Sequence, residues 1–222
     1  MKLLSVDLAR VAWLGHVGDF NPKGTNLYTL LVPFLIDTYK FQKYPDVRTL
    51  AENTAQAQGI SFEYGEFKLD GEDYPATMAF TIYPGGFFAD SRSSTRVSEA
   101  FLVDLFNGFS KVVRIPDYES IIKKRGFVSR LYVHTEKKVE FLNPKLLQLS
   151  EYLSQNVEDG TIDFQARSIS IWADQTLKIP PLNFKFEPTI GESFSDNRYF
   201  SVAPLPTDKH LELLDMLENI LS

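Results

Sequence analysis

Histidine is the side chain whose charge changes most easily near neutral pH, and this chain has only three: His16, His134 and His210. His134 and Glu136 are two residues apart, which places both on one face of a strand. Zinc deaminases use such a His-x-Glu pair together with cysteine ligands, but the chain contains no cysteine. His16 lies in a glycine-rich turn near Asp19, where it could act as a base. We favour solvent-exposed positions for His16 and His134, and we expect neither a metal site nor a cofactor.

Residues 90–96 offer a different chemistry, the binding of a small anion. They read Asp-Ser-Arg-Ser-Ser-Thr-Arg and precede a predicted helix. Backbone N–H groups at a helix start, together with the helix dipole, attract anions, and guanidinium groups add strong hydrogen-bond donors. The residues that would hold a phosphate or carboxylate are Arg92, Ser93, Ser94, Thr95 and Arg96. The alternative is an ordinary polar helix cap, with the arginines paired to Asp90 or Glu99.

Residues 193–200, nearer the carboxyl end, mix aromatic rings with polar groups. Exposed rings beside arginine are typical of the residues that dominate the binding energy of protein interfaces. Phe194, Arg198 and Tyr199 are therefore predicted to contact a protein partner or another copy of the chain. The alternative is a loop whose Phe194 and Tyr199 pack into the core.

Pro45-Asp46 and Glu66-Phe67-Lys68 resemble the Pro-Asp…Glu-x-Lys signature of a large family of metal-dependent nucleases. The resemblance implies two carboxylates that hold Mg²⁺ and a lysine that orients the attacking water. That signature needs the aspartate and the Glu-x-Lys on neighbouring strands of a hairpin, whereas residues 48–58 between them are predicted to form a helix. A metal-dependent nuclease therefore ranks below the two binding hypotheses.

Several common catalytic patterns do not occur in the sequence. There is no Gly-x-Ser-x-Gly nucleophile turn, and there is neither a Gly-x-Gly-x-x-Gly nor a Walker A loop. The net charge of −6 and the scattered basic residues make nucleic acid a poor default partner, because proteins that bind it usually carry a basic patch. The sequence therefore favours a non-enzymatic interaction or accessory protein, with an enzyme or sensor for a small anion as the alternative.

Composition indicates a soluble globular chain of 222 residues, 44% hydrophobic and 23% charged. Lys2 and Asp7 interrupt the amino-terminal stretch before an apolar region forms, which is unlike a signal peptide. The longest strongly apolar run, residues 30–36, is too short to cross a bilayer. We expect a cytoplasmic protein without a membrane segment, and we expect most of its 18 phenylalanines to lie in the core.

Hydrophobic periodicity predicts the elements that position these residues. Alternation over residues 60–89, broken by Asp-Gly and Pro-Gly-Gly turns, predicts a three-stranded antiparallel meander with a bulge at Gly65. Further strands are predicted over residues 3–14, where a helix is the alternative, and over residues 127–135, 162–172, 182–186 and 198–203. Helices are predicted over residues 33–39, with Pro33 in the first turn, over 48–58 and 95–112, over 144–157 with Asn143 as cap, and from Thr207 onward.

This order of elements defines the fold class. Runs of antiparallel strands with helices packed mainly on one face indicate an α+β protein. No repeat of 20–50 residues and no long linker divides the chain. We therefore predict a single compact α+β domain over residues 1–222.

Overall fold

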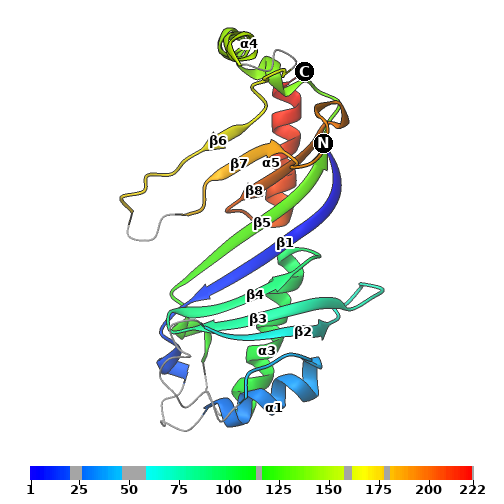
Figure 1. Cartoon of the computed structure of the whole chain (residues 1–222). Helices are drawn as coiled ribbons and strands as arrows, with labels where there is room; N and C mark the ends of the chain where they lie inside the picture. Colours follow the sequence, from blue (N-terminus) through cyan, green and yellow to red (C-terminus); the bar gives the residue numbers. More distant parts are fainter. Residues whose placement is uncertain (21–26, 47–58, 114–116, 158–161, 178–180, 222) are drawn as a thin grey trace. The chain divides into compact units, whose positions relative to one another are not determined.

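The computed structural model describes residues 1–20, 27–46, 59–113, 117–157, 162–177 and 181–221. Within this part of the chain, eight strands form one antiparallel sheet in the order β2-β3-β4-β1-β5-β8-β7-β6 (Figure 1). The strands are β1 (Lys2–Leu14), β2 (Ile60–Phe67), β3 (Ala76–Tyr83), β4 (Gly86–Ser91), β5 (Lys124–His134), β6 (Ile169–Ile171), β7 (Phe184–Pro188) and β8 (Arg198–Ala203). The helices are α1 (Leu27–Tyr39), α3 (Thr95–Val113), α4 (Leu147–Asn156) and α5 (Thr207–Ile220). The predicted α+β class is confirmed.

The order of elements repeats once along the chain. The series β1-α1-β2-β3-β4-α3 is followed by β5-α4-β6-β7-β8-α5, and the sheet order runs outward in the same way on both sides of the neighbouring strands β1 and β5. Thr95 and Thr207, the first residues of α3 and α5, are 112 residues apart. The repetition is one of topology, and its period is longer than the 20–50 residues of common sequence repeats.

Contacts within the chain group its residues into two compact units. Unit 1 comprises residues 1–7, 130–204 and 208–222, and unit 2 comprises residues 8–129 and 205–207. Strands β1 and β5 each contribute residues to both units. A single domain over residues 1–222 stays a prediction.

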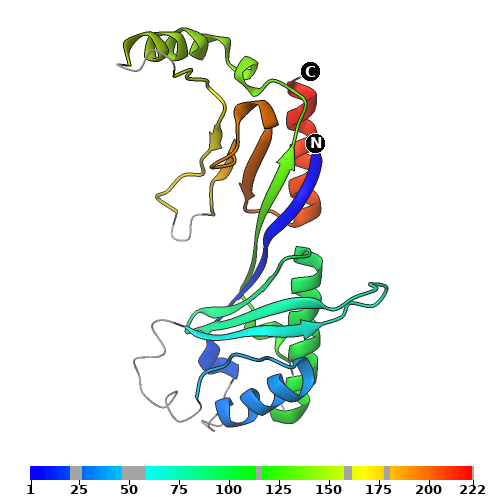
Figure 2. The ribbon, with the colours of Figure 1, turned by 45° about the vertical axis from the view of Figure 1, so that its right-hand side comes forward.

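Unit 2 has an aromatic core between the meander and two helices. The buried positions of β2 and β3 alternate with more exposed ones, so one face of these strands packs inward. Helices α1 and α3 lie on that face (Figure 2). The Phe101 ring of α3 is central: its centroid lies 4.9 Å from that of Tyr39 on α1 and 6.0 Å from that of Phe80 on β3. Each such ring removes a large apolar area from water.

The predicted meander is confirmed as β2, β3 and β4, which pair antiparallel. The register between β2 and β3 shifts between Phe62 and Gly65, as the predicted bulge requires. Tyr64 takes a left-handed conformation there, with φ of 60°. A Cβ atom on Gly65 would lie 2.6 Å from the Phe41 ring, so the close packing of that ring requires glycine.

The start of α1 was predicted wrongly. The helix begins at Leu27, and Pro33 lies inside it, six residues later. Proline fits best in the first helical turn because it has no N–H and a fixed φ, but here the preceding apolar residues extend the helix. The other helix predicted in this region, over residues 48–58, lies outside the described residues.

Two predictions around α4 need correction. Asn143 makes no side-chain capping hydrogen bond, and a 3₁₀ turn over Pro144–Leu146 precedes the α-helix, which begins at Leu147. The strand predicted over residues 162–172 is only the three residues of β6. Both segments lie in unit 1, whose strands β7 and β8 pair in register with Phe186 opposite Ser201.

Candidate functional site

The β7–β8 loop, residues 189–197, carries the residues predicted to bind a partner and is closely tied together by hydrogen bonds. Ser193 and Asp196 form a reciprocal capping box around a 3₁₀ turn. Asn197 ends the turn in the left-handed conformation, with φ of 50°, which asparagine tolerates better than most residues. The Thr189 N–H donates to the Arg198 carbonyl at 3.0 Å and closes the base of the loop.

A buried arginine outside the loop fixes it further. The Nε of Arg167 donates to the Tyr199 hydroxyl at 2.9 Å, and its Nη1 donates to the Phe194 carbonyl at 2.7 Å. Its Nη2 donates to the Asn197 side-chain oxygen. Glu140, 3.9 Å from Nε, supplies an opposite charge. A single guanidinium therefore connects three residues of the loop and its flank.

The three predicted partner-binding residues have different surroundings. Phe194 is 40% exposed, and Tyr199 is 1% exposed and stacks on Phe186 with 4.4 Å between ring centroids. Burial raises the pKa of the Tyr199 hydroxyl. Arg198 is exposed and pairs with Glu192 at 2.9 Å. Arg167 brings Phe194 and Tyr199 together, since its guanidinium carbon lies 4.9 Å and 5.6 Å from their ring centroids.

Two residues of this region, Ile190 and Arg167, were not predicted from the sequence. Ile190 is 99% exposed at the turn of the loop, next to Gly191 with φ of 84°. An isoleucine beside a glycine, in a loop whose only other large apolar residue is Phe194, was a signal for it. No sequence pattern marks Arg167, because its partners are about 30 residues away along the chain.

Helix α4 presents a second exposed apolar surface in unit 1. Leu149, Tyr152 and Leu153 are 60%, 65% and 48% exposed, whereas Ser150 is buried. Ser154 turns inward as well, since its hydroxyl accepts a hydrogen bond from the Phe164 N–H at 2.9 Å. Both views draw α4 apart from strands β6, β7 and β8 (Figures 1 and 2). The apolar side chains of α4 at positions 149, 152 and 153 therefore face outward.

The predicted anion-binding residues lie at the start of α3, where nearby hydroxyl groups already accept hydrogen bonds from some of the backbone N–H groups. The Thr95 N–H donates to the Thr207 hydroxyl at 3.0 Å, and the Thr207 N–H donates back to the Thr95 hydroxyl at 2.9 Å. The Val97 N–H donates to the Ser94 hydroxyl at 3.3 Å. Anion binding here stays a prediction, and it would depend on side chains more than on the helix start.

The arginines of this segment are exposed, as is Ser93 between them. The carboxylates expected to pair with them have other partners: Asp90 binds Arg10 at 2.7 Å, and Glu99 binds Arg125 at 3.0 Å. Within the described ranges no ion pair of Arg92 or Arg96 is found. Their guanidinium groups thus point to solvent from the segment predicted to bind an anion.

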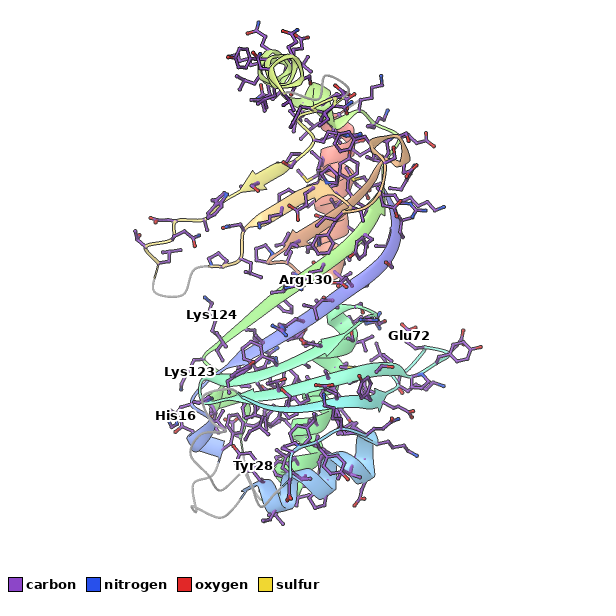
Figure 3. The ribbon with its side chains drawn as sticks, in the orientation of Figure 1. His16, Tyr28, Glu72, Lys123, Lys124 and Arg130 are labelled. Atoms are coloured by element: carbon purple, nitrogen blue, oxygen red, sulfur yellow. The ribbon has the colours of Figure 1, made fainter. Side chains whose placement is uncertain are left out.

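The three histidines differ in exposure: His16 is exposed, His134 at the end of β5 is half-buried instead of exposed as predicted, and His210 is buried. His16, labelled in Figure 3, is exposed and lies 3.6 Å from Asp19. His210 is fully buried on α5, and burial lowers its pKa to about 4. Its Nε2 is 2.8 Å from the Ser201 hydroxyl, which itself donates to the Lys185 carbonyl at 2.9 Å. Both side chains of this Ser-His pair are fully buried.

The described part of the chain contains no metal centre around the nuclease-like residues Asp46, Glu66 and Lys68. Glu66 and Lys68 line an open groove in unit 2. Among the residues that the structure describes, no group of three or more histidines and carboxylates could hold a metal ion. The nuclease resemblance therefore rests on the sequence alone.

Comparisons with known proteins do not assign the chain to a family. Neither the protein-family models nor the curated proteins give a match to this chain. No helix in the described ranges is long and apolar enough to cross a membrane.

Proposed function

We propose that the protein is a non-enzymatic interaction or accessory protein that binds a protein partner through the β7–β8 loop. The observation that carries the proposal is the nearly complete exposure of Ile190 on a loop held by an internal hydrogen-bond network. Ile190 and Phe194 supply the apolar contacts. Tyr199 serves as support beneath the loop, because it is buried.

Rigidity is what makes this loop suitable for binding. Ordering an interface side chain or loop on association costs free energy, and a loop already fixed in its bound shape avoids part of that cost. Arg167 and the capping box fix the loop in the free protein. An exposed isoleucine on a fixed backbone can then enter a pocket of the partner as a preformed anchor.

Helix α4 supports the same class of function. Its exposed Leu149 and Tyr152 belong to unit 1, as the loop does. Contiguous apolar side chains on a surface are typical of protein contacts. A partner that covers both surfaces would bury more area than either surface alone provides.

Affinity purification from the native host tests the proposal. The wild-type chain is compared with Ile190→Asp and with a control, Ile220→Asp, which changes an exposed isoleucine of α5. We expect a stoichiometric partner with the wild type and with the control, and its loss with Ile190→Asp. Circular dichroism should show all three folded, because both isoleucines are exposed.

An interaction that survives Ile190→Asp, or that Ile220→Asp removes equally, would contradict the loop as binding site. A wild-type chain that is recovered alone and monomeric would contradict the proposed function as a whole.

A further inference from the structure

Unit 2 contains an open groove of about 680 Å³ that the proposed function does not use. It lies between the carboxyl end of α1, residues 66–70 at the end of β2, and the outer face of α3. Tyr39, Phe67 and Val103 supply apolar lining. Each of these side chains is buried or half-buried, so the groove has an apolar floor.

The groove follows an edge of the sheet. β2 is the outermost strand on this side, and its neighbour in the sheet is β3. On its other side, among the described residues, a single bridge joins Lys43 to Glu63. Glu66 and Phe67, the last two residues of β2, lie beyond that bridge and past the bulge at Gly65; the Leu69 carbonyl that follows accepts a hydrogen bond from the Glu72 N–H. The backbone of an edge strand can pair with an added extended chain.

The charges of the groove are unequal. Its lining includes four carboxylates, Glu66, Asp70, Glu99 and Asp104, against the two basic side chains of Lys68 and Arg96. The Tyr39 hydroxyl donates to an Asp104 carboxylate oxygen at 2.7 Å, which fixes the orientation of that carboxylate without neutralising it. Glu99 is paired with Arg125. With Glu99 paired, the three carboxylates at positions 66, 70 and 104 face the two bases Lys68 and Arg96, so the groove carries a surplus of one negative charge.

We propose that this groove binds an extended basic peptide segment of another protein, as a strand added beside the end of β2. Apolar side chains on one face of the peptide would contact Tyr39, Phe67 and Val103. Lysine or arginine side chains would reach Glu66, Asp70 and Asp104. This is strand addition at a sheet edge, in which main-chain hydrogen bonds give affinity and the pockets for alternate side chains give specificity.

Charge complementarity selects the basic peptide over an acidic one. A chain rich in Asp or Glu would face three carboxylates that form no ion pair within the described residues, against two bases, and like charges in contact disfavour binding. Alternation of basic and apolar residues fits because side chains of a strand point alternately to its two faces. The inference concerns unit 2 and does not rest on the proposed function of the β7–β8 loop.

Fluorescence anisotropy with labelled eight-residue peptides tests the proposal. The probe alternates lysine and valine, and the control peptide alternates glutamate and valine. We expect the lysine peptide to bind at least about tenfold more tightly, and salt to weaken its binding because its contacts include exposed charges. The double substitution Glu66→Lys and Asp70→Lys should weaken that binding at least about tenfold.

A matched variant separates the groove from overall charge. Glu136→Lys changes an exposed carboxylate of unit 1 and should leave the affinity within about twofold of the wild type, as should Ile190→Asp. Equal affinity for the lysine and glutamate peptides would overturn the proposal. So would equal losses with Glu136→Lys and with a single substitution, Glu66→Lys.

Backbone pairing is tested with two N-methylated forms of the lysine peptide. The methyl groups block the N–H groups of odd residues in one form and of even residues in the other. Alternate N–H groups of an added strand point toward β2 and toward solvent, so one form should bind and the other should not. Equal binding of both forms would rule out strand addition.

Discussion

Replacement of Arg167 by methionine should destabilise unit 1 and disorder the β7–β8 loop. Methionine keeps the length and much of the volume of the side chain but removes every donor. The Tyr199 hydroxyl, the Phe194 carbonyl and the Asn197 side-chain oxygen would each lose a hydrogen bond. Glu140 would lose its ion-pair partner.

The magnitude follows from the burial of this site. Hydrogen bonds that involve a charged group contribute roughly 1.5–3 kcal/mol each, but their effects are not additive. Removal of one partner of a buried ion pair costs about 3–5 kcal/mol. We therefore expect a loss of about 4 kcal/mol in the free energy of unfolding, which with a urea m-value of about 2 kcal/mol/M lowers the midpoint by about 2 M.

Urea unfolding followed by circular dichroism measures this change. Arg198→Met is the matched control, because Arg198 is exposed and pairs only at the surface with Glu192. An exposed pair of this kind contributes about 0–1 kcal/mol. A loss below about 1 kcal/mol for Arg167→Met, or equal losses for the two variants, would refute the role assigned to Arg167.

Two further predictions concern pH and anions. His210 has a pKa of about 4 in the folded protein and about 6.5 when unfolded. Its protonation should therefore have no effect on stability above about pH 6.5, and should cost stability as the pH falls from about 6.5 to 4, by up to about 3 kcal/mol. His210→Gln should remove that part of the acid sensitivity; an unchanged pH dependence of urea unfolding would contradict it. Phosphate at about 100 times its dissociation constant should add about 2.7 kcal/mol if residues 92–96 bind it, and the paired substitutions Arg92→Gln and Arg96→Gln should abolish the rise in melting temperature. No rise for the wild type in phosphate, relative to chloride of equal ionic strength, would contradict the anion hypothesis.

The local elements of this protein were largely predictable because their signals are local. The alternation of residues 60–89 and the glycine at position 65 predict the meander and its bulge, and both are found. The start of α1 was not predictable from Pro33, since a favourable first-turn residue is also tolerated inside a helix when the preceding residues extend it. Asn143 likewise has the right type for a cap but makes no capping bond.

Which side of an element is apolar was easier to predict than whether that side faces the core or the solvent. Spacing marks Leu149 and Leu153 as neighbours on α4, but only the packing of Ser150 inward shows that the leucines face solvent. The same limit applies to the β7–β8 loop. Its composition indicates a binding segment, but not that Tyr199 is buried, that Ile190 is exposed or that Arg167, a residue distant in sequence, hydrogen-bonds Tyr199.

Site-specific photo-crosslinking at position 190 tests the central claim most directly. A photoreactive amino acid replaces Ile190 in one sample and Ile220 in the control, and both proteins are irradiated in cells of the native host. The account predicts one stoichiometric crosslinked protein from position 190 and none from position 220. The absence of a crosslink from position 190, or the same crosslinked species from both positions, would contradict the binding role of the β7–β8 loop.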